Sequence, residues 1–315
     1  MNPRELGVGS RGSRSRRDIQ WIRRLLFLLA ALSAGSARAQ ELTHLEARLR
    51  ERIESSGATV GLYFRDLVQP QVVAINADHR FHAASTMKIA VMIQVFRDVD
   101  AGLLSLRERL PVRTSFRSIA DSSEYSLSPA DDSDSSLYRE AGRTATVQRL
   151  VELMITVSSN LATNILVERV GASRVQATAR SLGADSIEIR RGVEDGPAFR
   201  AGLNNTTTAR DLGALLTALV ESRAATAVSC GAMLRILLNQ RFRDAIPAGL
   251  PRRTRIAHKT GTITAHHHDA AVVYLGGRPR YVLVVLTRGI EDQRSAAALI
   301  AELASLVHAH VAPGR

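Results

Sequence analysis

Runs of β-branched and aromatic residues stand near both ends of the chain. Residues 60–66 and 71–75 are separated by a short segment that contains Pro70, a pattern that predicts a β-hairpin. Near the C-terminus the runs RTRIAHKTGTI, HDAAVVYL and RYVLVVLTR predict three more strands, and Gly-Gly-Arg-Pro at 276–279 turns the last pair. A final helix is predicted from about residue 292 to 311, where apolar residues recur at helical spacing.

Between these β regions the hydrophobic pattern is helical. The predicted helices cover residues 86–101, 146–156, 160–170 and 208–221. Strands at both ends and helices between them predict an α+β fold, with an antiparallel sheet built from both termini and an inserted all-helical lobe. We expect one domain at 40–315, with an α/β lobe at about 40–84 and 222–315 and a helical lobe at about 85–221.

Residues 117–145 break the helical pattern. The segment is rich in serine and acidic residues and has few large apolar residues. That composition predicts a long loop or a partly disordered excursion at the solvated surface.

The N-terminal segment has the pattern of an export signal. Six arginines lie between Arg11 and Arg24, an apolar run covers 25–32, and Ala37-Arg38-Ala39 forms a cleavage site of the A-x-A type. We therefore expect residues 1–39 to be a signal peptide and the mature protein to be periplasmic or secreted. The apolar run is too short for a permanent membrane anchor.

Charge and cysteine content exclude several functions. The net charge of +12 falls to +6 when the eight arginines and two acids of the signal leave. No dense basic run with interleaved aromatic residues indicates nucleic-acid binding. The single cysteine, Cys230, rules out an intramolecular disulfide, and its apolar neighbours favour a buried packing role.

All but two of the 42 lysines and arginines are arginine, and the exceptions are Lys88 and Lys259. A buried amine can lose its proton at neutral pH, whereas a guanidinium cannot, so both lysines are candidates for chemistry. Ser85 precedes Lys88 by about one helical turn, which places a hydroxyl and an amine on the same side of a helix start. Lys259 opens a K-T-G sequence on a predicted strand, where an ammonium, the Thr260 hydroxyl and Gly261, which lets a ligand approach the backbone, suit a carboxylate-bearing ligand.

A third motif, Ser158-Ser159-Asn160, stands between two predicted helices. Its side chains can point from a connecting loop into a cleft, although a helix N-cap is the alternative role for each residue. The ordered motifs S-x-x-K, S-x-N and K-T-G resemble the serine β-lactamase and penicillin-binding protein superfamily, and specifically the class A β-lactamases. The resemblance extends over nearly all of residues 40–315.

The resemblance implies acyl transfer on a cyclic amide. Ser85 would attack the carbonyl carbon, and Lys88 would help to activate it. The backbone N–H groups of Ser85 and Thr262 would hold the oxyanion, and Ser158 would pass a proton to the leaving nitrogen.

The same resemblance implies substrate contacts. Asn160 would bind the side-chain amide of the substrate, and Lys259, Thr260 and Thr262 would meet its carboxylate. The implied partner is a small-molecule β-lactam. We expect no cofactor, no nucleic-acid partner and no stable membrane anchor. We also expect the protein to be a monomer.

Deacylation in class A enzymes uses a glutamate that lies before a Thr-Thr-Thr helix start. Here Glu194 precedes Thr206–Thr208, with Asn204 as a candidate water-positioning partner and Asp195 as a second candidate base. The loop lacks an E-P-x-L-N run, and Asn205 stands where a salt-bridging aspartate is common. A surface ion pair with the preceding arginines is the alternative role for this glutamate.

The sequence HHHD at 266–269 raises the question of a metal site. Neighbouring residues of a strand face opposite sides, so only His266 and His268 can share a ligand set, and the spacing does not fit a metal site. We expect no metal. Relatives use a basic residue on this strand to assist the carboxylate, and His268 and Arg294 are the candidates for that role here.

Three hypotheses follow for the function. The first is an exported β-lactamase, the second a penicillin-binding D,D-peptidase or related serine hydrolase, and the third a non-catalytic β-lactam or peptidoglycan binding module. A water that bridges Glu194 and Ser85 would distinguish the first from the others. The motifs do not indicate which class of β-lactam is preferred.

Overall fold

The computed structural model describes residues 39–312. The chain forms two compact units, Met1–Leu45 and Glu46–Arg315. In the first unit the described residues, 39–45, are helical, and the predicted signal peptide lies outside the described residues except for Ala39. The second unit begins with helical residues 46–54 and contains all the elements named below.

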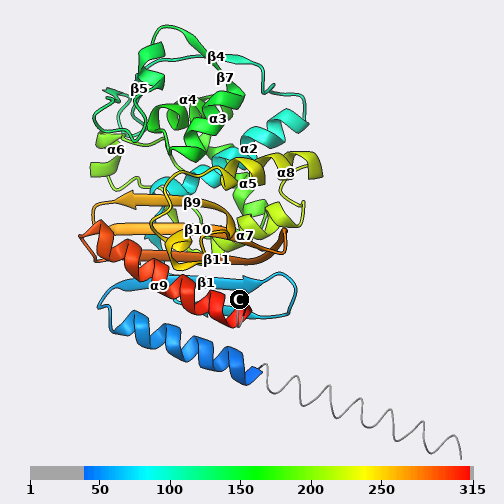
Figure 1. Cartoon of the computed structure of the whole chain (residues 1–315). Coiled ribbons are helices and arrows are strands. Elements are labelled where there is room, and N and C mark those ends of the chain that lie inside the picture. Colours follow the sequence, from blue (N-terminus) through cyan, green and yellow to red (C-terminus); the bar gives the residue numbers. More distant parts are fainter. Residues whose placement is uncertain (1–38, 313–315) are drawn as a thin grey trace, which may run out of the picture. The chain divides into compact units, whose positions relative to one another are not determined.

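A five-stranded antiparallel sheet is the centre of this unit (Figure 1). Its strands are β1 (Thr59–Asp66), β2 (Val72–Ile75), β9 (Arg255–Ile263), β10 (His266–Leu275) and β11 (Arg278–Arg288). They run in the order β2-β1-β11-β10-β9, and every neighbouring pair is antiparallel. N-terminal strands therefore pair directly with C-terminal ones, and the predicted fold class is confirmed.

Helices cover the sheet, which explains why its central strands are apolar on both faces. The C-terminal helix α9 (Gln293–Val311) lies along β10 and β11, and α7 (Ala209–Val220) packs on β1, β10 and β11 (Figure 1). Gly213 in α7 lies against the ring of Tyr63 in β1, where a Cβ atom would be only 2.3 Å from a ring carbon. This close approach of helix to strand requires glycine despite its low helix propensity.

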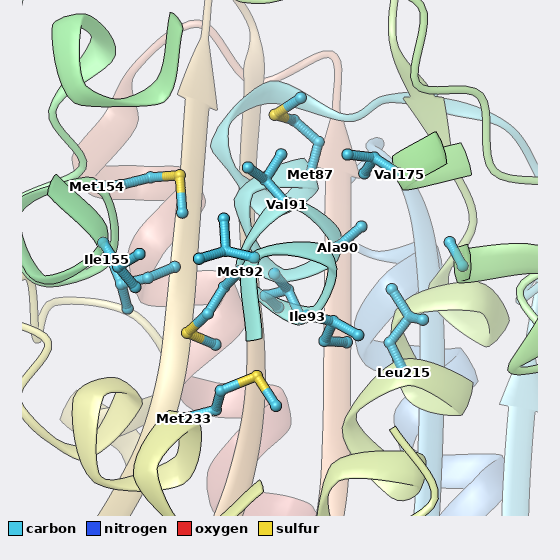
Figure 2. Packing of buried hydrophobic residues seen from close by; sticks show 14 of the residues in the cluster. Met87, Ala90, Val91, Met92, Ile93, Met154, Ile155, Val175, Leu215 and Met233 are labelled. Carbon is cyan, nitrogen blue, oxygen red and sulfur yellow. The ribbon is translucent and has the colours of Figure 1, made fainter. Parts of the chain in front are cut away.

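The helical region contains α2 (Lys88–Asp100), α3 (Val147–Thr156), α4 (Asn160–Val170), α5 (Ala172–Ser181), α6 (Gly196–Arg200), α8 (Ala227–Leu238) and the short 3₁₀ helices η1 (Ala84–Met87) and η2 (Leu137–Glu140). The 3₁₀ helix η3 (Ile246–Gly249) packs against α9 instead. Helix α2 is buried along most of its length. Figure 2 shows Val91 and Met92 of this helix among Met154 from α3 and Met233 from α8. The S-x-x-K motif is therefore anchored in the hydrophobic core.

Short two-stranded ladders complete the fold. They pair β3 (Phe81–His82) with β8 (Thr206–Thr207), β4 (Arg109–Pro111) with β7 (Thr144–Thr146), and β5 (Ser115–Arg117) with β6 (Glu124–Ser126). The segment 117–145 is thus more ordered than its composition predicts, because Phe116 and Tyr125 bring their rings to 6.0 Å across the β5–β6 hairpin.

Within residues 39–312, no helix is long and apolar enough to cross a membrane.

Cys230 is buried in α8, and its thiol donates to the carbonyl of Ala225 at 3.5 Å. Burial raises the pKa of this thiol. The packing role predicted for Cys230 is confirmed.

Candidate active site

Ser85 lies in the 3₁₀ turn η1, immediately before α2. The preceding residue, Ala84, has a φ of +46°, a left-handed conformation that is unfavourable for a residue with a side chain. The ring Nδ1 of His82 accepts the N–H of Ala84 at 3.0 Å and so supports this turn. Backbone strain of this kind is concentrated at functional sites.

Strand β9 passes close to this turn, and Gly261 makes the approach possible. A Cβ atom at Gly261 would lie 3.0 Å from the amide nitrogen of Ser85 and 3.1 Å from that of Thr86. The glycine of the K-T-G motif therefore brings the backbone of Thr262 beside Ser85. Both residues line the same cavities.

Lys88 is completely buried, and its three hydrogen-bond acceptors lie in one turn, residues 158–160. Its Nζ donates to the carbonyl of Ser158 at 2.6 Å, to Oγ of Ser158 at 3.2 Å and to Oδ1 of Asn160 at 2.8 Å. Burial lowers the pKa of Lys88 to about 7, against the opposing effect of nearby carboxylates. The amine can therefore accept or release a proton near neutral pH.

Lys259 is also completely buried and approaches the same hydroxyl. Its Nζ donates to Oγ of Ser158 at 3.0 Å and to the carbonyl of Thr260 at 2.8 Å. Burial, with the charge of Lys88 as a further cause, lowers the pKa of Lys259 well below its ordinary value. Because the Ser158 oxygen accepts from both amines, its own proton is available for a group in the cleft.

Glu194 lies on the same cleft and has a φ of +58°. Its Oε1 accepts the side-chain N–H of Asn160 at 3.2 Å, and Asn160 in turn accepts from Lys88. Partial burial is the largest cause of a raised pKa for Glu194, and Asp131 adds to it, while Lys88 opposes it. A carboxylate with this raised pKa is suited to act as a general base.

Two cavities, of about 480 and 370 Å³, flank Ser85. They share four lining residues: Ser85, Asn160, Glu194 and Thr262. The larger is walled by Phe199 and His82, and the smaller by Thr260 and Phe242. The motif residues thus lie where one continuous cleft divides.

Comparison with known proteins places this arrangement in a family. Residues 44–311 match the model of the β-lactamase enzyme family. The chain belongs to this family. Similar proteins are a β-lactamase of Streptomyces fradiae, 29% identical over 88% of this chain and 90% of its own length, and β-lactamase AST-1 of Nocardia asteroides, 32% identical over 83% and 82%.

Solved structures of two differently named proteins are similar to this chain. The structure of PBP-A has a TM-score of 0.73 and 26% identity, covering 84% of this chain and 95% of its own. A β-lactamase from Sphaerobacter thermophilus has a TM-score of 0.72 and 29% identity, covering 86% and 97%. The fold is therefore about equally similar to PBP-A and to this β-lactamase.

The carboxylate of Asp195, the second candidate base, accepts hydrogen bonds from two backbone N–H groups. Its Oδ1 accepts the N–H of Ala198 at 3.0 Å as the N-cap of α6, and its Oδ2 accepts the N–H of Ile119 at 3.1 Å. The side chain is 1% exposed. We infer a loop-anchoring role for Asp195 and keep Glu194 as the candidate base.

The loop before β8 is held by two asparagines. Asn205 accepts the backbone N–H groups of Arg190 and Arg191 at 2.8 and 3.2 Å and donates to the carbonyl of Arg191 at 2.9 Å. An amide thus anchors the loop at the position where a salt-bridging aspartate was the expected pattern.

Asn204 accepts from the guanidinium of Arg191 at 3.0 Å and is absent from the residues that line the two cavities. Among the described residues, no ion pair links Glu194 to these arginines. Arg190 pairs with Glu188, and the guanidinium of Arg191 donates to Leu203, Gly192 and Asn204.

Of the three consecutive histidines, His266 lines the larger cavity, His267 lines the smaller one, and His268 lines neither. His268 is completely buried, with Nε2 at 3.0 Å from the carbonyl of His82 and Nδ1 accepting the N–H of Thr287 at 3.2 Å. Burial lowers the pKa of His268 to about 3, so it is neutral. Its neighbour His267 lines the smaller cavity and places Nδ1 at 2.9 Å from the hydroxyl of Thr262.

The other candidate for the carboxylate, Arg294, is exposed at the start of α9 and does not line either cavity, although the adjacent Gln293 does. Across residues 39–312, no three His, Cys, Asp or Glu side chains are grouped as metal ligands. Sequence reasoning missed His267 and Phe199 as cleft residues. No pattern in the sequence pointed to His267 or to Phe199.

Proposed function

We propose that the protein is an exported serine β-lactamase that opens the β-lactam amide through an acyl-enzyme on Ser85. The observation that carries this proposal is the hydrogen-bonded series Lys88–Asn160–Glu194 beside Ser85. It places a candidate base for acylation and a candidate base for deacylation on one cleft. Membership of the β-lactamase family supports the same reaction class.

The steps of acylation are assigned to Ser85, Lys88 and Ser158. The neutral amine of Lys88 takes the proton of Ser85, whose oxygen bonds to the carbonyl carbon of the lactam. The oxyanion is held by the N–H groups of Ser85 and Thr262. Ser158 gives its proton to the lactam nitrogen as the C–N bond breaks, and it regains one from the protonated amine of Lys88, which donates to it.

Deacylation is assigned to Glu194. Its carboxylate takes a proton from a water molecule, which attacks the ester carbon of the acyl-enzyme, and the proton returns to the Ser85 oxygen as the ester bond breaks. The raised pKa of Glu194 favours this base role, and Asn160 fixes one carboxylate oxygen.

We propose that the substrate carboxylate binds on the smaller-cavity side, where it meets Thr260, Thr262 and the charge of Lys259.

The mature enzyme is proposed to begin near Gln40 after export. A basic n-region, a short apolar run and an A-x-A site support this localisation.

A penicillin-binding D,D-peptidase is the second candidate. The likeness to PBP-A, whose TM-score is within 0.01 of that of the Sphaerobacter thermophilus β-lactamase, favours it. Such a protein would be acylated by the same residues but would not clear a β-lactam acyl group. The two functions therefore differ in the fate of the adduct.

Time-resolved mass spectrometry of the purified protein with benzylpenicillin separates these functions. We expect a transient adduct on Ser85 that clears in the wild type and persists in Glu194→Gln. The matched control is Glu188→Gln, which removes a surface carboxylate paired with Arg80 and Arg190 and should clear its adduct normally. A lasting adduct on the wild type would support the peptidase, and the absence of any adduct would reject both.

A further inference from the structure

Asp132 lies in the segment for which the sequence predicts only solvated surface, yet its carboxylate reaches the active-site turn. Both of its oxygens lie 2.9 Å from the backbone nitrogen of Asn160. Its Oδ2 also accepts the N–H of Leu161 and the hydroxyl of Tyr138, each at 2.9 Å. The carboxylate thus binds the first two N–H groups of α4, which have no acceptor within the helix.

The turn that Asp132 holds supplies the three hydrogen-bond acceptors of Lys88 in the described part of the chain. Ser158 in this turn has a φ of +60°, so its backbone needs support from outside. The N-cap Ser159 gives part of that support by accepting the N–H of Ala162 at 3.3 Å. Asp132 adds further support from a different part of the chain, through the N–H groups of Asn160 and Leu161.

A small movement of this turn would change the hydrogen bonds of both buried lysines. It would change the distances from Nζ of Lys88 to Ser158 and Asn160, and it would change the distance from Nζ of Lys259 to Oγ of Ser158. Proton transfer needs donor and acceptor within hydrogen-bond reach, and misplacement by about 1 Å costs about 100-fold in rate.

We propose that Asp132 is a positioning residue for acylation, which holds the Ser158–Asn160 turn at the distance from Lys88 that proton transfer requires. This inference rests on the proposed β-lactamase activity and adds to it a residue outside the three motifs. Asp132 acts through the turn and does not touch the reacting atoms.

The charge of Asp132 gives a second, separable effect. Lys88 is faced by the carboxylates of Asp132 and Glu194 and by the amine of Lys259. Asp132 raises the pKa of Lys88 against the effect of burial, so its removal should lower that pKa further. The rise of the acylation rate with pH should then occur at lower pH, which a purely structural role would not cause.

The experiment measures the acylation rate constant with benzylpenicillin by rapid quench and mass spectrometry, between pH 5 and 9. Asp132→Asn keeps the size of the side chain but places an N–H₂ group against backbone N–H donors. We expect its maximal rate constant to fall by about 10- to 100-fold and its pH midpoint to move down. Asp132→Glu displaces the carboxylate but keeps its charge, so its rate should fall while its midpoint stays near that of the wild type.

Asp134→Asn is the matched control, because Asp134 lies in the same loop and accepts only from Ser136, at 3.1 and 2.8 Å. It should acylate as the wild type does. Wild-type rates and midpoints in Asp132→Asn, or an equal loss in Asp134→Asn, would overturn the inference while leaving the proposed function intact. If Asp132→Asn does not fold, a wild-type rate in Asp132→Glu overturns it. A wild type that forms no adduct overturns the proposed function and this inference together.

Discussion

Replacing Lys88 by arginine tests the proton-transfer role of this residue most directly. Lys88→Arg keeps a cation among the same acceptors, the carbonyl of Ser158 and Oδ1 of Asn160. It removes the capacity to be neutral at working pH, because a guanidinium has a pKa above about 12.

The lowered pKa of the buried amine sets the expected loss of acylation rate. With a pKa of about 7, about half of Lys88 is neutral at pH 7. An arginine at the same place is neutral in fewer than about one molecule in 10⁵. We therefore expect the acylation rate constant to fall at least about 10³-fold, with the residual rate due to the oxyanion N–H groups.

Single-turnover mass spectrometry with benzylpenicillin measures this rate constant, and thermal unfolding checks the fold. Overpacking by the larger side chain should cost about 1–3 kcal/mol of stability. Lys259→Arg is the matched control, because Lys259 is equally buried and its proposed role toward the carboxylate needs a charge. Its acylation should suffer much less. A Lys88→Arg variant that acylates within tenfold of the wild type would refute the role of a neutral amine.

Three further predictions concern the surroundings of the nucleophile. Gly261→Ala would place a methyl group 3.0 Å from the amide nitrogen of Ser85, so acylation should slow by about tenfold or more, and an unchanged rate would contradict the close approach. Burial holds the pKa of His268 at about 3, so between pH 6.5 and 3 the unfolded chain takes up a proton that the folded chain does not. The free energy of unfolding should lose about 1.4 kcal/mol per pH unit in this range, and urea titrations of His268→Gln should lack this part of the slope. Phe199→Ala should raise KM for benzylpenicillin more than for 6-aminopenicillanic acid, which has no acyl side chain, whereas Phe242→Ala in the other cavity should not discriminate in this way.

The amino-acid sequence determined the fold class and the identity of the central residues. Period-two and 3.6-residue hydrophobic patterns are local, and they predicted the sheet strands and the bounds of α4 without a three-dimensional structure. The rarity of lysine singled out Lys88 and Lys259, and the structure places both amines at the hydroxyl of Ser158. Helices α5 and α8 were missed because few residues of α5 are apolar and Val228 of α8 faces solvent.

Contacts between distant segments were decided only by the tertiary structure. The choice of His267 over His268 depends on the pairing of β9 with β10, which sets the face of each residue. The approach of Asp132 to Asn160 spans 28 positions and leaves no trace in any periodic pattern. Such contacts depend on how loops close over the core, and neither hydrophobic periodicity nor motif spacing encodes that closure.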